Sequence, residues 1–192
     1  MSVKRFGQKH PLSRANASEK VKAAAGFKED APQPLPPCVR GPRIRLGLVG
    51  GGRDACIGAV HRIAARLDDR YELVAGALSS THAKSAESAA ALGIARSYGS
   101  FEEMAEAEAA REDGIEAVSI VTPNHVHYAA AAAFQRRGIH VICDKPLTST
   151  LDDAHALVGA AEASPAQFVF THNYTGYPLI RQARQMVADG TL

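Results

Sequence analysis

The sequence has 192 residues, of which 46% are hydrophobic, and a formal net charge of +2 at pH 7. A charge so close to zero gives no electrostatic argument for nucleic acid binding, and no apolar run approaches the roughly 20 residues of a membrane-spanning helix. Three widely spaced cysteines exclude a disulfide framework and lack metal-ligand spacing, so we expect a cytoplasmic protein without a metal site.

The first 42 residues differ from the rest of the chain. They are rich in lysine and arginine, have little apolar periodicity and end in a proline-rich stretch, residues 31–37, that favours extended backbone. We therefore expect residues 1–42 to form a disordered N-terminal leader that adds nothing to the core. The basic start leaves a transit peptide as an alternative.

From residue 43 onward, short apolar runs alternate with longer helical patterns. The predicted strands are 44–49, 73–78, 117–121, 140–143 and 168–171, and the predicted helices are 58–67, 83–92, 101–110, 125–137, 151–163 and 179–188. This alternation predicts an α/β fold, a doubly wound parallel sheet of Rossmann type, because each parallel return needs a crossover helix. We expect a dinucleotide-binding domain at residues 43–175 and a connecting helix within 176–192.

Three consecutive glycines follow the first predicted strand. Gly50, Gly52 and Ala55 match the G-x-G-x-x-G/A spacing of a dinucleotide-binding turn, in which glycine lets phosphates approach the backbone at a helix N-terminus. The turn runs on through residues 53–57 before Gly58, so we expect a loop longer than the standard one and include Ile57 among the cofactor-binding candidates.

The end of the second predicted strand carries Ser79, Ser80 and Lys84 but no carboxylate. An enzyme that prefers NAD often has an acid here for the ribose 2′-hydroxyl, whereas a serine hydroxyl and a lysine suit a 2′-phosphate. We count these three residues as cofactor-binding candidates that favour NADP. The alternative is that the serines cap a helix and that Lys84 is merely solvated.

The strand at 117–121 leads into Thr122, Pro123, Asn124, His125 and His127. Proline stops strand pairing at the carboxyl edge of the sheet, where ligands bind in open α/β folds. Thr122 and Pro123 are predicted to line the nicotinamide side of a cleft, and Asn124 and His127 are further cofactor-binding candidates, Asn124 also as the cap of the following helix. The two histidines lie two positions apart and do not share a helix face, so they do not predict a metal site. Packing or capping by a histidine is the alternative.

The next strand, 140–143, ends in Asp144, Lys145 and Pro146. Burying an ionisable pair costs free energy unless it is partnered, so two charged residues at this edge indicate a site. An ordinary polar exit from a strand is the alternative.

Taken together, these motifs resemble the Gfo/Idh/MocA oxidoreductases, the family of glucose–fructose oxidoreductase and inositol dehydrogenase. The matching pieces are Gly-Leu-Val-Gly-Gly-Gly, Thr-Pro-Asn-His-Val-His, and Asp-Lys-Pro-Leu in place of the usual Glu-Lys-Pro. The resemblance implies binding of NAD or NADP and oxidation or reduction of a sugar or polyol. It also implies that Lys145 is the catalytic residue that orients the substrate oxygen, and that both Asp144 and Lys145 lie at the cofactor site.

Members of that family continue into a second α+β domain that supplies an aspartate and a histidine for proton transfer. This sequence stops at Leu192, so we expect that domain to be absent or truncated, and the face it would cover to favour self-association. Two alternatives to the dehydrogenase stay open: a non-catalytic nucleotide-binding module or remnant, and an interaction domain whose glycines only pack.

Overall fold

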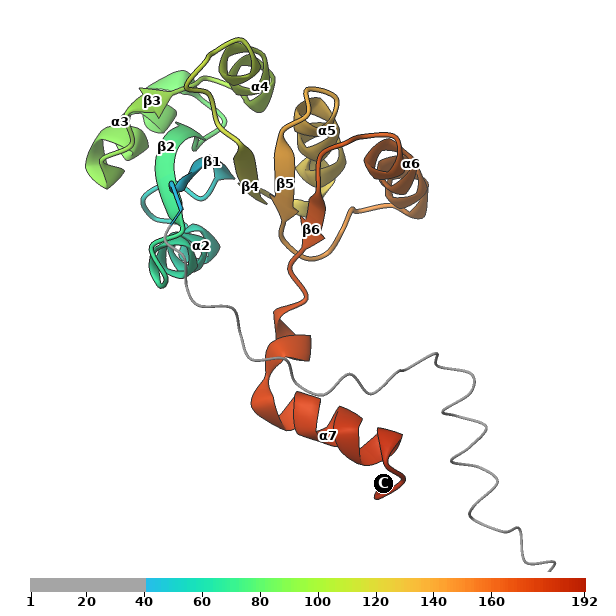
Figure 1. Cartoon of the computed structure of the whole chain (residues 1–192). Coiled ribbons are helices and arrows are strands. Elements are labelled where there is room, and N and C mark those ends of the chain that lie inside the picture. Colours follow the sequence, from blue (N-terminus) through green and yellow to red (C-terminus); the bar gives the residue numbers. More distant parts are fainter. Residues whose placement is uncertain (1–40) are drawn as a thin grey trace, which may run out of the picture. The chain divides into compact units, whose positions relative to one another are not determined.

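A computed structural model describes residues 41–192 (Figure 1). The predicted leader lies outside these residues except for positions 41 and 42. The described chain separates into two compact units, divided between His172 and Asn173. The elements of the first unit are β1 Ile44–Gly50, α2 Cys56–Arg66, β2 Tyr71–Ala77, α3 His82–Leu92, β3 Arg96–Ser97, α4 Phe101–Ala109, β4 Ala117–Val121, α5 Asn124–Gln135, β5 His140–Cys143, α6 Leu151–Glu162 and β6 Phe168–Phe170.

The strands of this unit form one parallel sheet in the order β3-β2-β1-β4-β5-β6. The predicted doubly wound Rossmann-type sheet is therefore confirmed. β1 is central, and the chain winds from it first toward β3 and then, from β4, toward β6. Loops leaving β1 and β4 therefore diverge at the carboxyl edge of the sheet, which is where ligands bind in such folds.

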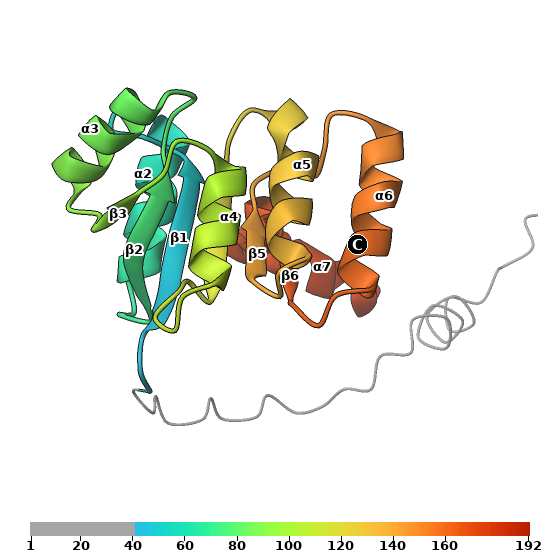
Figure 2. The same ribbon diagram turned by 90° about the horizontal axis from the view of Figure 1, so that it is seen from above.

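Helices cover both faces of the sheet, with α2 on one side and α4 and α5 on the other (Figures 1 and 2). Successive residues of β1 serve the two faces, because side chains alternate along a strand. Val49 packs in a cluster with Met104 of α4 and Phe134 of α5, and Leu48 packs in a second cluster with Ala89 of α3.

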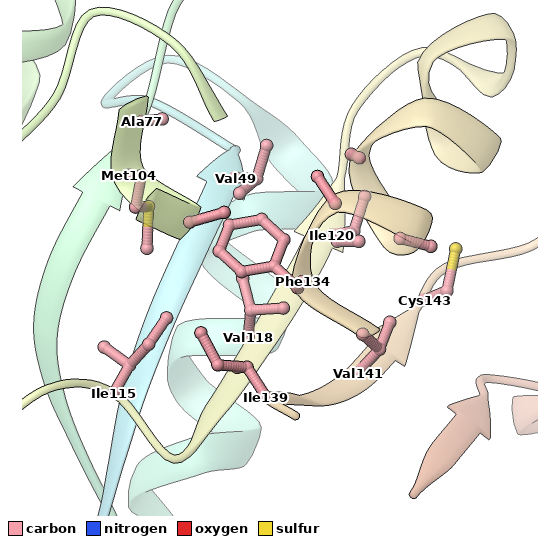
Figure 3. Close-up of a cluster of buried hydrophobic side chains, with 14 of the residues drawn as sticks. Val49, Ala77, Met104, Ile115, Val118, Ile120, Phe134, Ile139, Val141 and Cys143 are labelled. Carbon is pink, nitrogen blue, oxygen red and sulfur yellow. The ribbon is translucent and has the colours of Figure 1, made fainter. Parts of the chain in front are cut away.

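Phe134 is the largest fully buried side chain, and it lies among Val118, Ile120 and Ile139 (Figure 3). Burying a side chain of this size stabilises the fold by about 1.5–3 kcal/mol. The rigid layer of α5 on β4 and β5 holds the loops that leave these two strands.

Two helix starts, those of α4 and α6, have side-chain caps. The Ser100 Oγ accepts a hydrogen bond from the Glu103 amide at 3.2 Å, and the Thr150 Oγ1 accepts one from the Asp153 amide at 3.1 Å. In a capping box the Glu103 carboxylate would accept a hydrogen bond from the Ser100 amide. Here it accepts one from the Gly99 amide instead, at 2.8 Å, so this bond is shifted by one residue.

Two features of the first unit differ from the predictions. β3 consists of only Arg96 and Ser97, and no apolar alternation marks it. The Arg96 guanidinium instead bonds the buried carboxylate of Glu108, at 2.7 and 2.8 Å, which ties the edge strand to α4. The second feature is the start of α5, where Pro123 occupies the N-cap and Asn124 is the first helical residue. The expected Asn124 cap is thus wrong, because Asn124 already lies in the helix, and the N-cap Pro123, with ψ of 147°, has no side chain that can cap it.

The second unit contains a 3-10 turn, η1 Asn173–Gly176, and the helix α7 Pro178–Ala188. Pro178 stands at the first helical position, where its missing N–H costs nothing. The rings of Tyr174 and Tyr177 meet edge to face with centroids 5.5 Å apart. The domain boundaries predicted at 42/43 and 175/176 stay predictions.

Candidate functional site

The turn after β1 needs glycine for conformational reasons. Gly50 and Gly51 have φ of +77° and +68°, a region that residues with a Cβ rarely adopt. At Gly52, an added Cβ would lie 3.0 Å from the Leu78 carbonyl oxygen and 2.9 Å from the Ser88 Oγ. The three glycines therefore form a bare stretch of backbone directly before α2.

A fourth glycine, Gly58, allows α2 to pack closely against the turn at the end of β1. A Cβ on Gly58 would collide with the backbone of Gly51, so α2 approaches the turn more closely than any other residue would allow. The Arg62 guanidinium, also on α2, donates to the Gly51 carbonyl at 2.5 Å and holds the turn from the same side. Gly58 rather than Ala55 thus fills the packing role of the third glycine in the motif, which fits the longer loop expected from the sequence.

A cleft of about 560 Å³ opens at the carboxyl ends of β1, β2 and β4. Its volume lies within the usual range for small-molecule sites. The structure brings together seven of the predicted cofactor-binding residues along its walls: Gly50, Gly52, Ala55, Ser79, Ser80, Thr122 and Pro123. Residues that the sequence did not single out also line it, including Gly99, Phe101 and Glu102, because the loop before α4 reaches the same edge.

One wall of the cleft holds a polar atom without a partner. The Thr122 Oγ1 is buried and makes no hydrogen bond within residues 41–192. Buried hydroxyls are normally bonded, so this one is an exception beside the cleft. The Thr122 Cγ2 methyl, rather than the hydroxyl, lies toward the glycine turn, 3.0 Å from where a Cβ on Gly50 would stand. The bare glycine backbone at the N-terminus of α2 is the feature that fits a dinucleotide, whose pyrophosphate binds at helix N-termini.

A second cavity of about 410 Å³ adjoins the cleft and shares Gly52, Ala55 and Ser79 with it. Lys84, the remaining candidate for a 2′-phosphate, lines this cavity together with Arg53. The Arg53 guanidinium lies 3.4 Å from the Glu87 carboxylate and is half exposed. Arg53 was missed from the sequence, although a cation directly after a glycine turn is the signal that would have identified it.

The remaining candidates lie outside both cavities. Ile57 is 37% exposed on α2, and Asn124 is exposed at the start of α5. Lys145 is exposed as well, in the turn after β5, and the Lys145–Pro146 peptide bond is cis. No hydrogen bond or ion pair joins the Lys145 ammonium to another residue of the described chain, so it is free to meet a ligand.

Asp144 is anchored from three directions. Its amide donates to the Ile120 carbonyl at 3.0 Å, and its Oδ1 accepts a hydrogen bond from the Thr171 hydroxyl at 2.7 Å. The His61 Nε2 lies 3.8 Å from the same carboxylate oxygen. Asp144 therefore holds the turn that presents Lys145, a structural task, and its carboxylate lines neither cavity.

Two histidines lie near this turn, and neither lines the cleft. His127, predicted to bind the cofactor, is 1% exposed, with Nδ1 2.7 Å from the Pro146 carbonyl oxygen and Nε2 2.9 Å from that of Thr122. His61, which the sequence did not single out, has Nδ1 2.8 Å from the Ser119 Oγ. Burial lowers the pKa of His61, and Asp144 opposes this shift without reversing it.

A cysteine nucleophile and a metal site find less support in the structure. Burial, reinforced by Asp144, raises the pKa of the Cys143 thiol to about 12, so it does not supply a thiolate nucleophile near neutral pH. Among residues 41–192, no group of three or more His, Cys, Asp and Glu side chains is placed to hold a metal ion. Within the same residues, every helix is too short or too polar to cross a membrane.

Comparisons with known proteins agree with this geometry. Residues 44–172 match the model of the Gfo/Idh/MocA family, described as an oxidoreductase family with an NAD-binding Rossmann fold. The chain is 36% identical over 152 residues to the uncharacterized oxidoreductase YfiI of Bacillus subtilis, a match that covers 78% of this chain and 39% of the relative. It is 32% identical over 144 residues to a D-xylose 1-dehydrogenase (NADP(+)) of Haloferax volcanii, covering 75% and 41%.

Solved structures of oxidoreductases also match the chain. An oxidoreductase from Sinorhizobium meliloti matches with 65% identity and a TM-score of 0.74, over 79% of this chain and 43% of that one. An inositol dehydrogenase homolog from Azotobacter vinelandii, solved with NAD+, matches with 43% identity and a TM-score of 0.74, over 78% and 39%. The chain spans about two fifths of the length of these relatives. It belongs to the Gfo/Idh/MocA family of oxidoreductases and carries that family's NAD-binding Rossmann domain.

Proposed function

We propose that this chain is the cofactor-binding part of an NAD(P)-dependent oxidoreductase that acts on a sugar or polyol. The observation that supports this best is the cleft at the divergence of β1 and β4, which is lined by a bare glycine turn directly before α2. Relatives that act on D-xylose and inositol by name support the substrate class.

Each part of the cleft has its own task in this proposal. The backbone of Gly50–Gly52 and the start of α2 hold the pyrophosphate, and Thr122 and Pro123 flank the nicotinamide. The nicotinamide, when bound, accepts or supplies the hydride. The Lys145 ammonium orients the substrate oxygen and stabilises the negative charge that develops on it as the hydride is transferred.

We further propose that NADP is preferred over NAD. Residues 77–84 hold no carboxylate for a ribose 2′-hydroxyl, whereas Ser79 joins Lys84 and Arg53 around the second cavity. The same cavity is also lined by Asp54 and Glu87, whose carboxylates lie 3.5 and 3.4 Å from the Arg53 guanidinium. The Lys84 ammonium and the Ser79 hydroxyl are therefore the groups that suit a 2′-phosphate. A cytoplasmic location and a homo-oligomeric assembly complete the proposal. The first follows from the cysteine spacing, and the second from apolar side chains left exposed on α2, among them Val60 and Ile63.

The direct test is a titration of the purified chain with NADH and with NADPH, followed by nicotinamide fluorescence. We expect saturable binding of both and a lower Kd for NADPH. The variant Gly52→Val should lose binding, because its side chain would meet the Leu78 carbonyl and fill the approach to the turn. Gly159→Ala is the matched control, since nothing lies within 4 Å of the added Cβ. A folded chain that binds neither dinucleotide would contradict the proposal.

A further inference from the structure

We propose that His127 is a positioning residue that sets the distance between the Thr122–Pro123 loop and the Lys145–Pro146 turn. This inference rests on the proposed function, because it concerns where the Lys145 ammonium stands relative to the nicotinamide side of the cleft. It assigns His127 no contact with cofactor or substrate, since its ring is 1% exposed.

The geometry of the contacts carries the argument. The Nδ1 and Nε2 atoms of His127 lie 2.7 and 2.9 Å from the carbonyl oxygens of Pro146 and Thr122. A planar aromatic ring fixes the separation of its two nitrogens, so contact with both carbonyls fixes the separation of the two loops. Carbonyl oxygens only accept hydrogen bonds. The ring therefore donates to both carbonyls when both of its nitrogens carry protons, and to one carbonyl when only one nitrogen does.

No other hydrogen bond makes this link within residues 41–192. The pairing of β4 with β5 ends at Ile120 and Cys143, and the last bond across it runs from the Asp144 amide to the Ile120 carbonyl. Beyond that bond, the two loops share no direct hydrogen bond in the described chain. The ring of His127, which precedes Pro146 by 19 residues in the sequence, bridges the two loops.

The position of His127 on α5 makes the bridge rigid. α5 packs on the sheet through Ala130, Ala131 and Phe134, all completely buried. The ring therefore extends from a fixed helix, and the two carbonyls are held relative to the core rather than only to each other. The Thr122 backbone is fixed at its carbonyl, which holds one residue of the cleft wall relative to the core.

Three variants test the bridge. His127→Phe keeps a planar ring and removes both contacts, whereas His127→Gln keeps an amide donor for one carbonyl. His155→Phe is the matched control, because His155 is exposed on α6. The first readout is hydrogen–deuterium exchange of the free chain in the segments 121–124 and 144–148, with α4, 101–109, as the internal reference.

For His127→Phe we expect exchange roughly tenfold faster in the two loop segments, with α4 unchanged and an intermediate effect in His127→Gln. The second readout is acylation of Lys145 by an amine reagent at saturating NADH or NADPH, followed by mass spectrometry. Bound dinucleotide should protect Lys145 in the wild type and in His155→Phe, and protect it several-fold less in His127→Phe.

Uniformly faster exchange with unchanged protection of Lys145 would show a merely structural histidine and overturn the inference, as would no change in either readout. If His127→Phe does not fold, the comparison of His127→Gln with the wild type decides. A wild-type chain that binds no dinucleotide contradicts the proposed function, while the exchange of the free chain still decides whether the bridge exists.

Discussion

The Nε2 atom of His61 lies 3.8 Å from the Oδ1 atom of Asp144. His61 belongs to the helix that follows the glycine turn, and Asp144 immediately precedes Lys145. The contact therefore links the segment proposed to hold the pyrophosphate to the segment that carries the proposed catalytic residue. On its other side, His61 is joined to Ser119 in the middle of β4, at 2.8 Å.

The buried position of His61 predicts a pH dependence of stability. Burial lowers its pKa below the ordinary 6.5, so the unfolded chain takes up a proton before the folded chain does as the pH falls. The stability that His61 contributes is then present above pH 6.5 and is lost as the pH falls from that value toward the folded pKa. Melting temperatures measured from about pH 8 to about pH 5 should fall more steeply for the wild type than for His61→Gln. Equal slopes would contradict the prediction, and exposed His155→Gln should keep the wild-type slope.

The contact between α2 and the glycine turn predicts a strong effect of a single methyl group. Gly58→Ala places a Cβ against the Gly51 backbone, which cannot move without displacing β1 or α2. We expect a loss of about 2–4 kcal/mol in the free energy of unfolding. Urea denaturation measures it. Gly159→Ala in α6 makes no such contact and should be neutral or stabilising by up to about 1 kcal/mol. Equal effects of the two substitutions would show that the close approach at Gly58 is not tight in solution.

The second cavity predicts which residues discriminate the cofactors. Lys84→Ala should raise the Kd for NADPH by roughly five- to tenfold and leave that for NADH nearly unchanged, because only NADPH has the 2′-phosphate. Ser79→Asp should weaken NADPH binding further through repulsion of like charges. Fluorescence titrations with both dinucleotides give the ratio. If both Kd values change equally, Ser79 and Lys84 do not contact the 2′-phosphate and serve only as a cap and a solvated side chain at the start of α3.

The free ammonium of Lys145 predicts a separation of chemistry from binding. In a preparation that turns over a sugar or polyol, Lys145→Ala should reduce kcat by roughly a thousandfold, the size expected for loss of one stabilising group at a developing oxyanion. The Kd for the dinucleotide should stay within a few-fold, since Lys145 lines neither cavity. Lys145→Arg keeps the charge but not the compact ammonium, and it should not restore full turnover. Near-normal turnover in Lys145→Ala would remove this residue from catalysis.

Much of the fold followed from local patterns. The strand at 117–121 was predicted with its observed bounds because its residues are apolar on both faces, as strands covered on both sides must be. The edge strand β3 could not be predicted, since two polar residues have no periodicity and Arg96 is held by Glu108 from a separate helix. The helix starts at Ser100 and Thr150 were predictable because a cap depends on residues three apart.

By itself, the sequence determined the helices, every strand except β3, the glycine turn and the charged turn after β5, because each depends on neighbours along the chain. Only the tertiary structure decided that Gly58 packs against Gly51, that His61 meets Asp144, and that His127 bridges Thr122 and Pro146. These contacts join segments that the parallel sheet brings to one edge, and no local pattern encodes which side chains meet there. Packing of the helices on the two faces of the sheet fixes those meetings, and with them the geometry of the site.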